Sequence, residues 1–535
     1  MDLRGRTDER SVLTAPLYRS SRVYPFQARG VALGYLRREN LVVWSTGIGK
    51  SHFAMALAAL LAEDGLIDHV IVVCESNKLD EWVGDFRVYT AFRTIEKYMG
   101  SNRSRLLVDL PDVLVTTYET SRNDAASKIK GRPRALQPGP LTLALQDKKV
   151  LVIYDEASRL KNRDSGIYKH HEYWLTHTRR KGDVRSTALT ATPLESSPEN
   201  IFNLARLLQP GFMTVADFEI LHVRGRDIFG RANGYHHIGD ADRVWSDEPT
   251  LFERLAPILQ VKDKFDPDVV AEFPSQVEQF EYVEYPRSVA KIIDELTEKD
   301  AKTGNSGWMT ARQFADHPAA ILQSQSDLAR WAVAEYGADT LQALPSPKVD
   351  ALLRNLKLLV HEEGRKVVVF TFFGQTVLPL LHRALTTPRK DWVPVTVAIN
   401  HGGLSAQERE ENKARFRTGD AQVFLSSDAG SRGINLPEAT AVINYEMPLL
   451  HATYEQRINR IHRIDSKADS VLAITLIGKD TVEESIVASA MERNQWFDAF
   501  INSSLAAGTK VHRPSAEERK LLMRMAQAET STIDG

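Results

Sequence analysis

The sequence is poor in cysteine, in long apolar runs and in net charge. Its 535 residues include one cysteine, Cys74, which excludes an intramolecular disulfide and a cysteine-based metal site; we expect this thiol to pack inside a strand. The longest apolar stretch, residues 54–62, is far shorter than the roughly 20 residues that span a membrane. The first residues (MDLRGRTDER) lack the apolar segment of a secretory signal. We therefore expect a cytoplasmic protein that contacts no membrane.

The balance of charge leaves the choice of partner open. There are 68 lysines and arginines against 70 acids, which gives a net charge of −2. A protein that grips a phosphate backbone can be neutral overall if its positive charge is confined to one cleft. Hydrophobic residues at 43% and charged residues at 26% are typical of a globular protein. The length exceeds one ordinary core and predicts two to four domains.

Two stretches of the chain alternate short apolar runs with helical ones. The first begins at residues 41–44 (LVVW), passes through a glycine-bearing turn into a helical run, and ends at residues 186–192 (STALTAT). The second extends from residues 366–373 (KVVVFTFF) to residues 470–477 (SVLAITLI). Apolar β-rich runs separated by helical ones predict parallel, doubly wound sheets. The predicted fold class is therefore α/β, with two lobes of similar size.

The segment between the two lobes has a different pattern. It contains turn-rich sequence (RGRDIFGRANGYHHIGD) and several helical runs, which predict a mainly helical insertion. The expected boundaries are an N-terminal arm at residues 1–22, the first lobe at 23–210, the insertion or linker at 211–347, the second lobe at 348–480 and a helical C-terminal extension at 481–535.

A glycine-bearing loop follows the first apolar run, at residues 45–51 (STGIGKS). A phosphate needs a loop whose backbone N–H groups converge on it, and glycine is required where side chains would collide. The helix after the loop would present its positive N-terminus to the anion. Lys50 would reach the β- and γ-phosphates, and the Ser51 hydroxyl would bind Mg²⁺. Trp44 stands where the strict phosphate-loop pattern begins with glycine, so the loop alone is an incomplete match.

Two acids, Asp155 and Glu156, follow the apolar run at residues 149–154. An aspartate in this place can hold Mg²⁺ through water, and an adjacent glutamate can orient and deprotonate the attacking water. Ligands of parallel α/β sheets bind at the carboxyl ends of the strands. The other interpretation is a solvated turn with two acids, but the phosphate loop upstream favours a nucleotide site.

A basic pattern at residues 456–463 (QRINRIHR) is the third feature. On a helix, Gln456, Arg460 and Arg463 would share a face by their i, i+4 and i+3 spacing. Two arginines that project together suit the γ-phosphate in its transition state, where an arginine finger accelerates transfer by about 10³–10⁵-fold. Taken alone, the pattern also fits an exposed basic helix face.

The ordered set of these motifs resembles the motors of helicase superfamily 2, and among them the Swi/Snf-like ATPases that translocate on double-stranded DNA. The resemblance covers residues 24–503, and the small chain is similar to bacterial or phage members. The matching segments are residues 24–27 (YPFQ), 45–51, 70–86 (VIVVCESNKLDEWVGDF), 113–119 (VLVTTYE), 154–162 (YDEASRLKN), 189–194 (LTATPL), 346–359 (SPKVDALLRNLKLL), 426–439 (SSDAGSRGINLPEA) and 456–464.

The resemblance implies two RecA-like lobes, with ATP and Mg²⁺ as cofactors. Thr190 and Thr192 would couple the state of the nucleotide to the grip on DNA. The metal would be held by Ser51 and Asp155. The catalytic set would be Lys50 on the phosphates, Asp155, Glu156 as acid/base, and Arg460 and Arg463 as arginine fingers. The nucleotide-binding set would be Gln27, which reads adenine in the family, with Thr46, Gly47, Gly49, Lys50, Ser51, Gly433 and Gln456.

Some positions depart from the family pattern. Ser158 stands where relatives have a histidine that helps to link hydrolysis to DNA contact. We therefore expect hydrolysis to be retained, whereas the strength of its coupling to movement is the property that this substitution would change. The family's Arg-Arg pair near residues 259–262 is missing.

Contacts to nucleic acid are expected at loops that follow strands. The family positions are Thr117, Thr371, Ser427 and residues 400–403, where backbone N–H groups and hydroxyls can reach phosphates. Such a grip is independent of base sequence and sensitive to salt.

Two further segments are candidates for nucleic-acid contact, each against the alternative of a solvated loop. One is the basic segment at residues 128–134 (KIKGRPR), with Lys128, Lys130 and Arg132, and the other is residues 224–237. The paired histidines at 170–171 and 236–237 lack the partners of a metal site.

The expected function is ATP-dependent translocation on double-stranded or branched DNA, with remodelling of DNA structures or of DNA-bound proteins. One alternative is a strand-separating DNA or RNA helicase in replication or repair. Another is a regulatory ATPase associated with RNA polymerase, and a protein partner in replication, repair or transcription fits each of these. The sequence lacks chromatin-reader modules, which favours a bacterial or phage-infected cell as its setting over that of a eukaryotic remodeller.

Overall fold

In the computed structural model, the chain divides into two units. Unit one comprises the described residues up to 270, and unit two comprises those from 272 on. The structure describes residues 17–19, 23–101, 103–129, 132–191, 197–228, 230, 232–264, 266–270, 272–302, 309–431, 434–464, 466 and 468–487.

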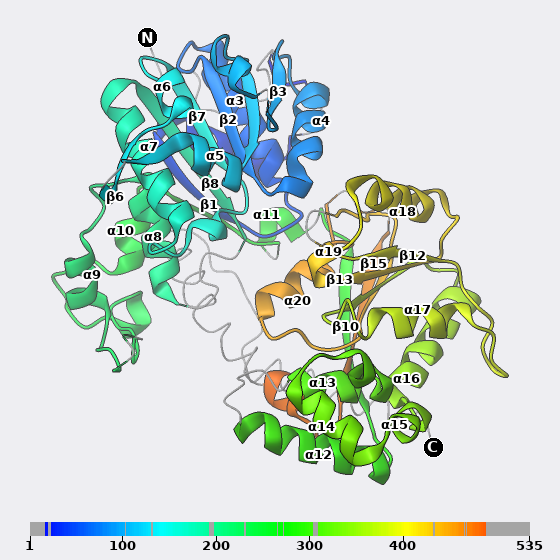
Figure 1. Ribbon diagram of the computed structural model, residues 1–535. Helices are drawn as coiled ribbons and strands as arrows, with labels where there is room; N and C mark the ends of the chain where they lie inside the picture. Colours follow the sequence, from blue (N-terminus) through cyan, green and yellow to red (C-terminus); the bar gives the residue numbers. More distant parts are fainter. Residues whose placement is uncertain are drawn as a thin grey trace. The chain divides into compact units, whose positions relative to one another are not determined.

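Unit one is built on a seven-stranded parallel sheet with strand order β3-β4-β2-β7-β8-β1-β9 (Figure 1). Its central strands are runs of buried apolar residues, because a parallel sheet is covered on both faces. The strands are β1 (Glu39–Trp44), β2 (His69–Cys74), β3 (Ile95–Tyr98), β4 (Val113–Thr117), β7 (Lys149–Tyr154), β8 (Asp183–Thr190) and β9 (Leu259–Lys262).

Successive residues of these strands point to opposite faces, and each face packs against helices. On one face, strand residues such as Val43 and Val73 share a core with Trp174 of α7. On the other, Trp44 packs against Phe53 of α3, with ring centroids 5.1 Å apart. The helices of unit one are α2 (Pro25–Leu36), α3 (Lys50–Glu63), α4 (Leu79–Tyr89), α5 (Tyr118–Ala125), α6 (Pro140–Ala144), α7 (Gly166–Lys181), α8 (Pro198–Leu208), α9 (Val215–His222), α10 (Leu251–Leu255) and α11 (Pro267–Val270).

An antiparallel hairpin stands apart from the sheet of unit one. Its strands are β5 (Ala126–Ile129) and β6 (Arg132–Pro138), so the segment expected as a basic loop is a strand pair instead. The described part of the N-terminal arm also packs on this unit, because Tyr18 pairs with Thr90 and its hydroxyl lies 2.8 Å from His52 Nδ1.

Unit two is built on a six-stranded parallel sheet with strand order β10-β15-β14-β11-β13-β12. The same alternation divides its core: Val367 and Val369 pack with α16 and α17, whereas Val368 and Phe370 pack with α18 and α20. The strands are β10 (Ser275–Val283), β11 (Val367–Thr371), β12 (Val397–Asn400), β13 (Val423–Ser427), β14 (Ala441–Asn444) and β15 (Ser470–Gly478). The helices of this part of unit two are α16 (Pro347–Leu356), α17 (Leu378–Thr386), α18 (Ala406–Thr418), α19 (Asp428–Ser431) and α20 (His451–Ile458).

Unit two also carries a group of four helices with its own apolar core. They are α12 (Arg287–Lys302), α13 (Met309–Asp316), α14 (Asp327–Tyr336) and α15 (Ala338–Ala343). A buried ion triad ties this group to the rest of the unit, because Lys348 Nζ lies 2.8 Å from Asp316 Oδ1 and 2.6 Å from Glu483 Oε1. Burial lowers the pKa of Lys348, but the two carboxylates outweigh this and raise the pKa above its ordinary value.

The α/β class with two parallel sheets is confirmed, but the segment between the lobes needs correction. Residues 211–347 were predicted to form one mainly helical insertion, whereas β9 joins the sheet of unit one and β10 joins that of unit two. Both are edge strands that carry polar residues, such as Lys262 and Glu278, so their apolar pattern is weak. The predicted helix through Arg463 is also shorter, because α20 ends at Ile458 and the chain continues in turns.

Cys74 is buried in β2, as expected. In the part of the chain that the structure describes, no helix is both long and apolar enough to cross a membrane.

Buried histidines predict that the fold loses stability in acid. Burial lowers the pKa of His171 to about 3 and that of His222 to about 4. In the unfolded chain a histidine binds a proton near pH 6.5, so the contribution of each neutral buried histidine to the free energy of unfolding is fully present above that pH. As the pH drops toward the folded pKa, this contribution falls by roughly 1.4 kcal/mol per pH unit for each such histidine. We expect the melting temperature to decrease between pH 6.5 and 4.5. His222→Phe, which stays aromatic beside Phe218, should reduce that slope; an unchanged slope would contradict the assignment.

Candidate nucleotide site

The loop between β1 and α3 has the shape that a phosphate-binding loop requires. Gly47 and Gly49 have φ angles of 84° and 88°, in the left-handed region that favours glycine. A Cβ atom on Gly49 would lie 2.2 Å from Gln27 Nε2. Trp44 still belongs to β1, and its ring is core packing against Phe53. The loop therefore begins after Trp44, whose ring belongs to the core.

Gln27 holds this loop from α2. Its Nε2 donates to the carbonyl of Ile48 at 2.9 Å, and its Oε1 accepts the backbone N–H of Tyr24 at 3.1 Å. Its side chain is buried, so both ends of the amide are fixed beside the loop. Gln27, the predicted nucleotide-binding glutamine, therefore has a direct role in shaping the loop.

Lys50 begins α3, and its side chain folds back over the loop. Its Nζ donates to the carbonyls of Trp44 at 2.9 Å and Ser45 at 3.3 Å. The hydroxyl Oγ1 of Thr46 is buried and forms no hydrogen bond to a described residue. An ammonium group and an unsatisfied buried hydroxyl at a helix N-terminus are suited to an anionic ligand.

A second support for the loop comes from residues that the sequence did not single out. Ser45 Oγ donates to Asp263 Oδ2 at 2.9 Å, and Ser45 N donates to the Lys262 carbonyl at 2.9 Å. Asp263 is buried, and its own N–H donates to Asp266 Oδ2 at 3.1 Å. These residues follow β9, which was expected to lie in the insertion, so no local pattern connected them with the phosphate loop.

The two predicted acids lie at the carboxyl end of β7. Asp155 is buried, and its Oδ2 accepts a hydrogen bond from Trp82 Nε1 at 2.8 Å. Its carbonyl accepts from the Tyr118 hydroxyl at 2.8 Å, so helices α4 and α5 both fix its position. No described residue donates to Asp155 Oδ1, which leaves this oxygen for another ligand.

Glu156 has a left-handed backbone, with φ 51° and ψ 54°. This conformation is unfavourable for a residue with a side chain and costs on the order of 1–3 kcal/mol, and such strain clusters at functional sites. Thr190 ends β8, which lies between β7 and β1 in the sheet, and Val43 is its register partner. The acids and the phosphate loop therefore end on the same edge, one strand apart, with Thr190 between them.

In unit two, the most buried arginine of the basic motif is Arg457, which had no predicted role. Its Nε and Nη2 contact Asp428 at 2.7 and 2.9 Å, and Nη2 also contacts Glu446 Oε1 at 3.0 Å. Burial lowers the pKa of Arg457, but the two carboxylates outweigh it and raise the pKa above its ordinary value. Arg457 thus joins α20 to α19 and to the end of β14.

The predicted arginine fingers lie beyond the end of α20. Arg463 Nη1 donates to Asn435 Oδ1 at 2.8 Å, and Arg460 Nη1 donates to the Ile434 carbonyl at 3.3 Å. Gln456 is on the helix and half-buried. The three residues do not share one helix face, but both arginines contact the segment that follows the predicted Gly433, which is itself outside the described residues.

Three predicted nucleic-acid contacts are buried. Thr117 Oγ1 accepts the N–H of Thr120 at 3.1 Å, Thr371 Oγ1 accepts that of Phe373 at 3.3 Å, and Ser427 Oγ accepts that of Gly430 at 3.3 Å. Each hydroxyl therefore fixes the turn that follows its strand.

The structure describes two of the remaining predicted residues, Lys128 and Arg132. Thr192 and Lys130 lie outside the described residues, Arg132 lies in β6, and Lys128 is exposed in β5. Within the described segments, no cluster of three or more histidine, cysteine, aspartate or glutamate side chains could hold a metal ion by itself.

Comparison with known proteins identifies two domains in sequence order. Residues 26–331 match the SNF2-related domain, and residues 347–465 match the helicase conserved C-terminal domain. Against the uncharacterized ATP-dependent helicase YqhH of Bacillus subtilis, the chain is 24% identical over 95% of its length and 84% of the relative.

Other relatives are longer or more distant. The chain is 26% identical to the CHD3-type chromatin-remodeling factor CHR7 of Arabidopsis thaliana over 90% of its own length but 38% of that protein, so it spans well under half of that relative. The Pyrococcus furiosus Hef helicase domain has a similar fold, with a TM-score of 0.53 and 16% identity over 89% of this chain and 100% of that one.

The bond between Ser45 and Asp263 predicts a measurable effect on nucleotide affinity. A hydrogen bond to a charged group contributes about 1.5–3 kcal/mol. We expect Asp263→Ala to raise the Kd of a fluorescent ATP analogue roughly tenfold, through a loosened phosphate loop. Ser45→Ala should produce a similar rise, and the double variant should add little to either single one. Additive losses, or unchanged affinity in properly folded single variants, would show that the bond does not shape the site.

Proposed function

The chain belongs to the SNF2-related family, and from this membership we propose that it hydrolyses ATP and uses the energy to move along double-stranded DNA. The observation that carries the proposal is the shared sheet edge in unit one, where the phosphate loop after β1 and the acids after β7 lie one strand apart. Relatives named as an ATP-dependent helicase and as chromatin-remodeling factors support both parts of it.

The residues present fit ATP with Mg²⁺. Thr46 Oγ1 and the N–H groups at the start of α3 offer donors to phosphate oxygens, and Lys50 offers a charge. Mg²⁺ prefers oxygen ligands, and Ser51 Oγ with Asp155 Oδ1 would hold it. When bound, the ion would neutralise phosphate charge and align the β- and γ-phosphates.

We propose that Glu156 accepts a proton from the water that attacks the γ-phosphorus. The new bond joins the water oxygen to phosphorus, the bond to the β–γ bridging oxygen breaks, and ADP and phosphate result. Lys50 would stabilise the growing charge on the phosphates in unit one. Arg460 and Arg463 are proposed to act as arginine fingers in this reaction.

Thr190 is the proposed link between nucleotide state and DNA grip. Thr190 lies in β8, between β7, which carries the acids, and β1, which leads into the phosphate loop. A displacement of either neighbouring strand would therefore move Thr190. Thr117, Thr371 and Ser427 are proposed to act by fixing turns whose N–H groups face phosphates, because their own side chains are buried and each accepts a backbone N–H of its turn.

Hydrolysis should depend on Lys50 in the phosphate loop and on Glu156 after β7. Lys50→Ala removes the charge on the phosphates, and Glu156→Gln removes the proton acceptor while keeping its size. We expect each to lower DNA-stimulated ATP hydrolysis by at least about 10³-fold. The matched control is Lys291→Ala, which removes an exposed lysine of α12 and should hydrolyse ATP like the wild type. Substantial turnover in either site variant would overturn the assignment.

A displacement assay can distinguish translocation along a duplex from unwinding of that duplex. A translocase on duplex DNA should displace the third strand of a triplex in an ATP-dependent manner without unwinding the duplex itself. We expect hydrolysis to be stimulated most by duplex DNA when duplex, single-stranded and forked DNA and RNA are compared side by side. Efficient unwinding of a plain duplex, or stimulation by RNA alone, would favour a strand-separating helicase instead.

A further inference from the structure

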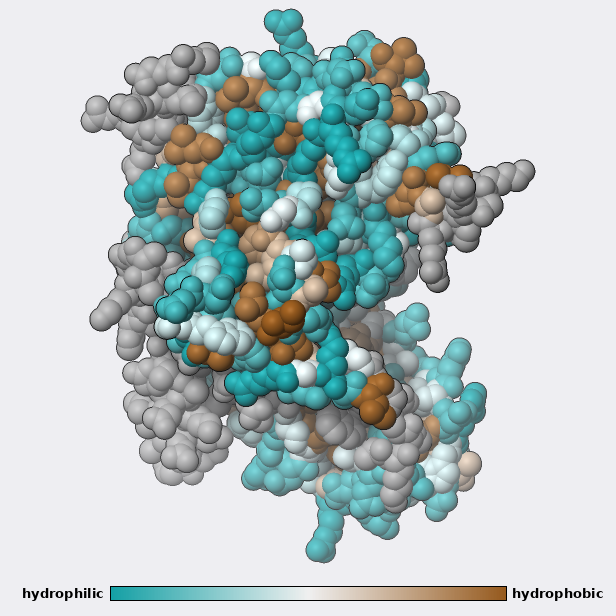
Figure 2. Space-filling model, turned by 90° about the vertical axis from the view of Figure 1, so that its left-hand side faces the viewer, coloured by the Kyte–Doolittle hydropathy of each residue, from teal (hydrophilic) through white to brown (hydrophobic). Residues whose placement is uncertain are grey.

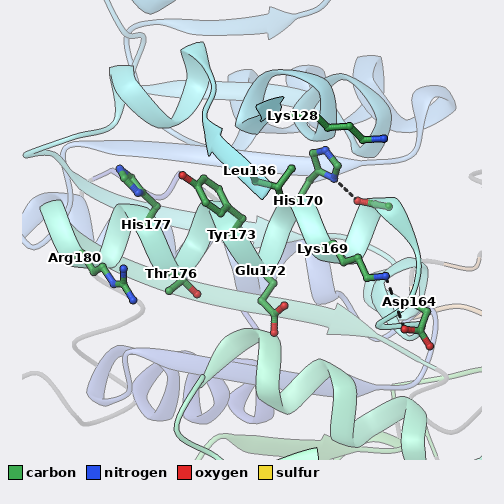
Figure 3. A pocket seen from close by; sticks show the side chains of 11 residues that line it. Lys128, Leu136, Asp164, Lys169, His170, Glu172, Tyr173, Thr176, His177 and Arg180 are labelled. Atoms are coloured by element: carbon green, nitrogen blue, oxygen red, sulfur yellow. Dashed lines mark hydrogen bonds and ion pairs between the residues drawn. The ribbon is translucent and has the colours of Figure 1, made fainter. Parts of the chain in front are cut away.

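A groove of about 830 Å³ lies in unit one between the β5–β6 hairpin and α7 (Figure 3). Lys128 and Leu136 are register partners across the hairpin, so their side chains stand on the same face of it, and both line the groove. From α7, His170, Tyr173 and His177 project toward the hairpin. The groove is therefore built by a helix and by a hairpin that lies outside the sheet.

The charges in this groove favour an anion. Its charged lining residues are three cations and two acids, and both acids already have partners. Asp164 lies 3.8 Å from Lys169, and Glu172 lies 3.8 Å from Arg206. Lys128 and Arg180 form no ion pair with any residue that the structure describes. These two cations are thus left for a ligand that brings its own negative charge.

An aromatic pair adds a second kind of contact. The rings of Tyr173 and His177 are stacked, with centroids 5.7 Å apart and an interplanar angle of 17°. Both side chains are half-buried, and the hairpin residue Leu136 lines the same space. A flat aromatic pair beside cations is the combination on which unpaired bases stack while their phosphates are neutralised.

We propose that this groove binds a single-stranded segment of nucleic acid, with a base on Tyr173 and His177 and phosphates at Lys128 and Arg180. The proposal rests on the proposed function in one respect, namely that nucleic acid is the polymer on which the protein acts. A duplex cannot offer the same contact, because its bases are hidden in their own stack. The residues that line the groove differ from Thr117, Thr371 and Ser427, where duplex contact is expected.

The side of the molecule on which β6 lies is mostly hydrophilic among its described residues. Figure 2 shows the side of the molecule that is at the left in Figure 1, where β6 is labelled. Among the described residues on that side, hydrophobic side chains form small groups between hydrophilic ones. A partner that needs a broad apolar contact finds little of it there.

Binding of a labelled oligothymidine, followed by fluorescence anisotropy at several salt concentrations, tests the proposal. We expect the double variant Lys128→Ala/Arg180→Ala to raise the Kd about tenfold or more and to lower the slope of log Kd against log salt by up to about 2. Tyr173→Ala should raise the Kd at least about fivefold, and Tyr173→Phe should restore it. A double control, Lys291→Ala/Arg330→Ala, removes two exposed cations of unit two and should bind like the wild type.

Each other outcome has a definite meaning. Wild-type Kd and salt slope in the groove variants would overturn the site. Equal losses on a blunt duplex, with no effect of Tyr173→Ala, would overturn the single-strand assignment. Competition by polyglutamate that depends on Lys128 and Arg180, without oligothymidine binding in the groove, would assign it to an acidic protein segment. A wild-type protein that binds no DNA and shows no DNA-stimulated hydrolysis would instead contradict the proposed function.

Discussion

The end of β1 is the point on which the candidate site depends, because three separate segments hold the loop that follows it. The amide of Gln27 bonds to Ile48 from α2, Asp263 bonds to Ser45 from the turn after β9, and β8 pairs along β1 up to Thr190. A loop with two left-handed glycines is costly to order, since glycine loses the most backbone freedom on folding. These bonds offset that cost and leave the loop shaped before any phosphate arrives, which is the condition for strong electrostatic stabilisation.

Much of the fold could be predicted because buried parallel strands are continuous apolar runs. Strands β2, β7 and β11 are of this kind, and their places in the sequence were correct. The edge strands could not be found in this way. β9 (LQVK) and β10 (SQVEQFEYV) each have a strand neighbour on one side only and carry charges, and what makes them strands is pairing with β1 and β15, which are distant in sequence. Local pattern contains no information about such partners.

The candidate site divides in the same manner. Residues that would touch a ligand, such as Lys50 and Asp155, stand in short motifs whose chemistry is legible from residue type and spacing. Residues that position the two motifs of unit one, such as Trp82 and Asp263, are brought there by the tertiary structure. Arg457 shows where prediction from the motif ends. It lies within the basic motif, but its buried bonds to Asp428 and Glu446 give it a structural role, whereas the turn after α20 carries Arg460 and Arg463.

The buried hydroxyls also change how a grip on nucleic acid has to be explained. Thr117, Thr371 and Ser427 are buried and each accepts a backbone N–H within its own turn, so a side chain that moved outward to reach a phosphate would leave that N–H unsatisfied at a cost of about 1–3 kcal/mol. A grip that moves repeatedly is better served by groups that are not needed to hold the fold. Backbone N–H groups at the helix starts meet this requirement, and so do Lys128 and Arg180, whose charges have no partner among the described residues. In the proposed translocase, the turns would set the geometry of the DNA contact, and exposed cations such as Lys128 and Arg180 would contribute the salt-sensitive part of the affinity.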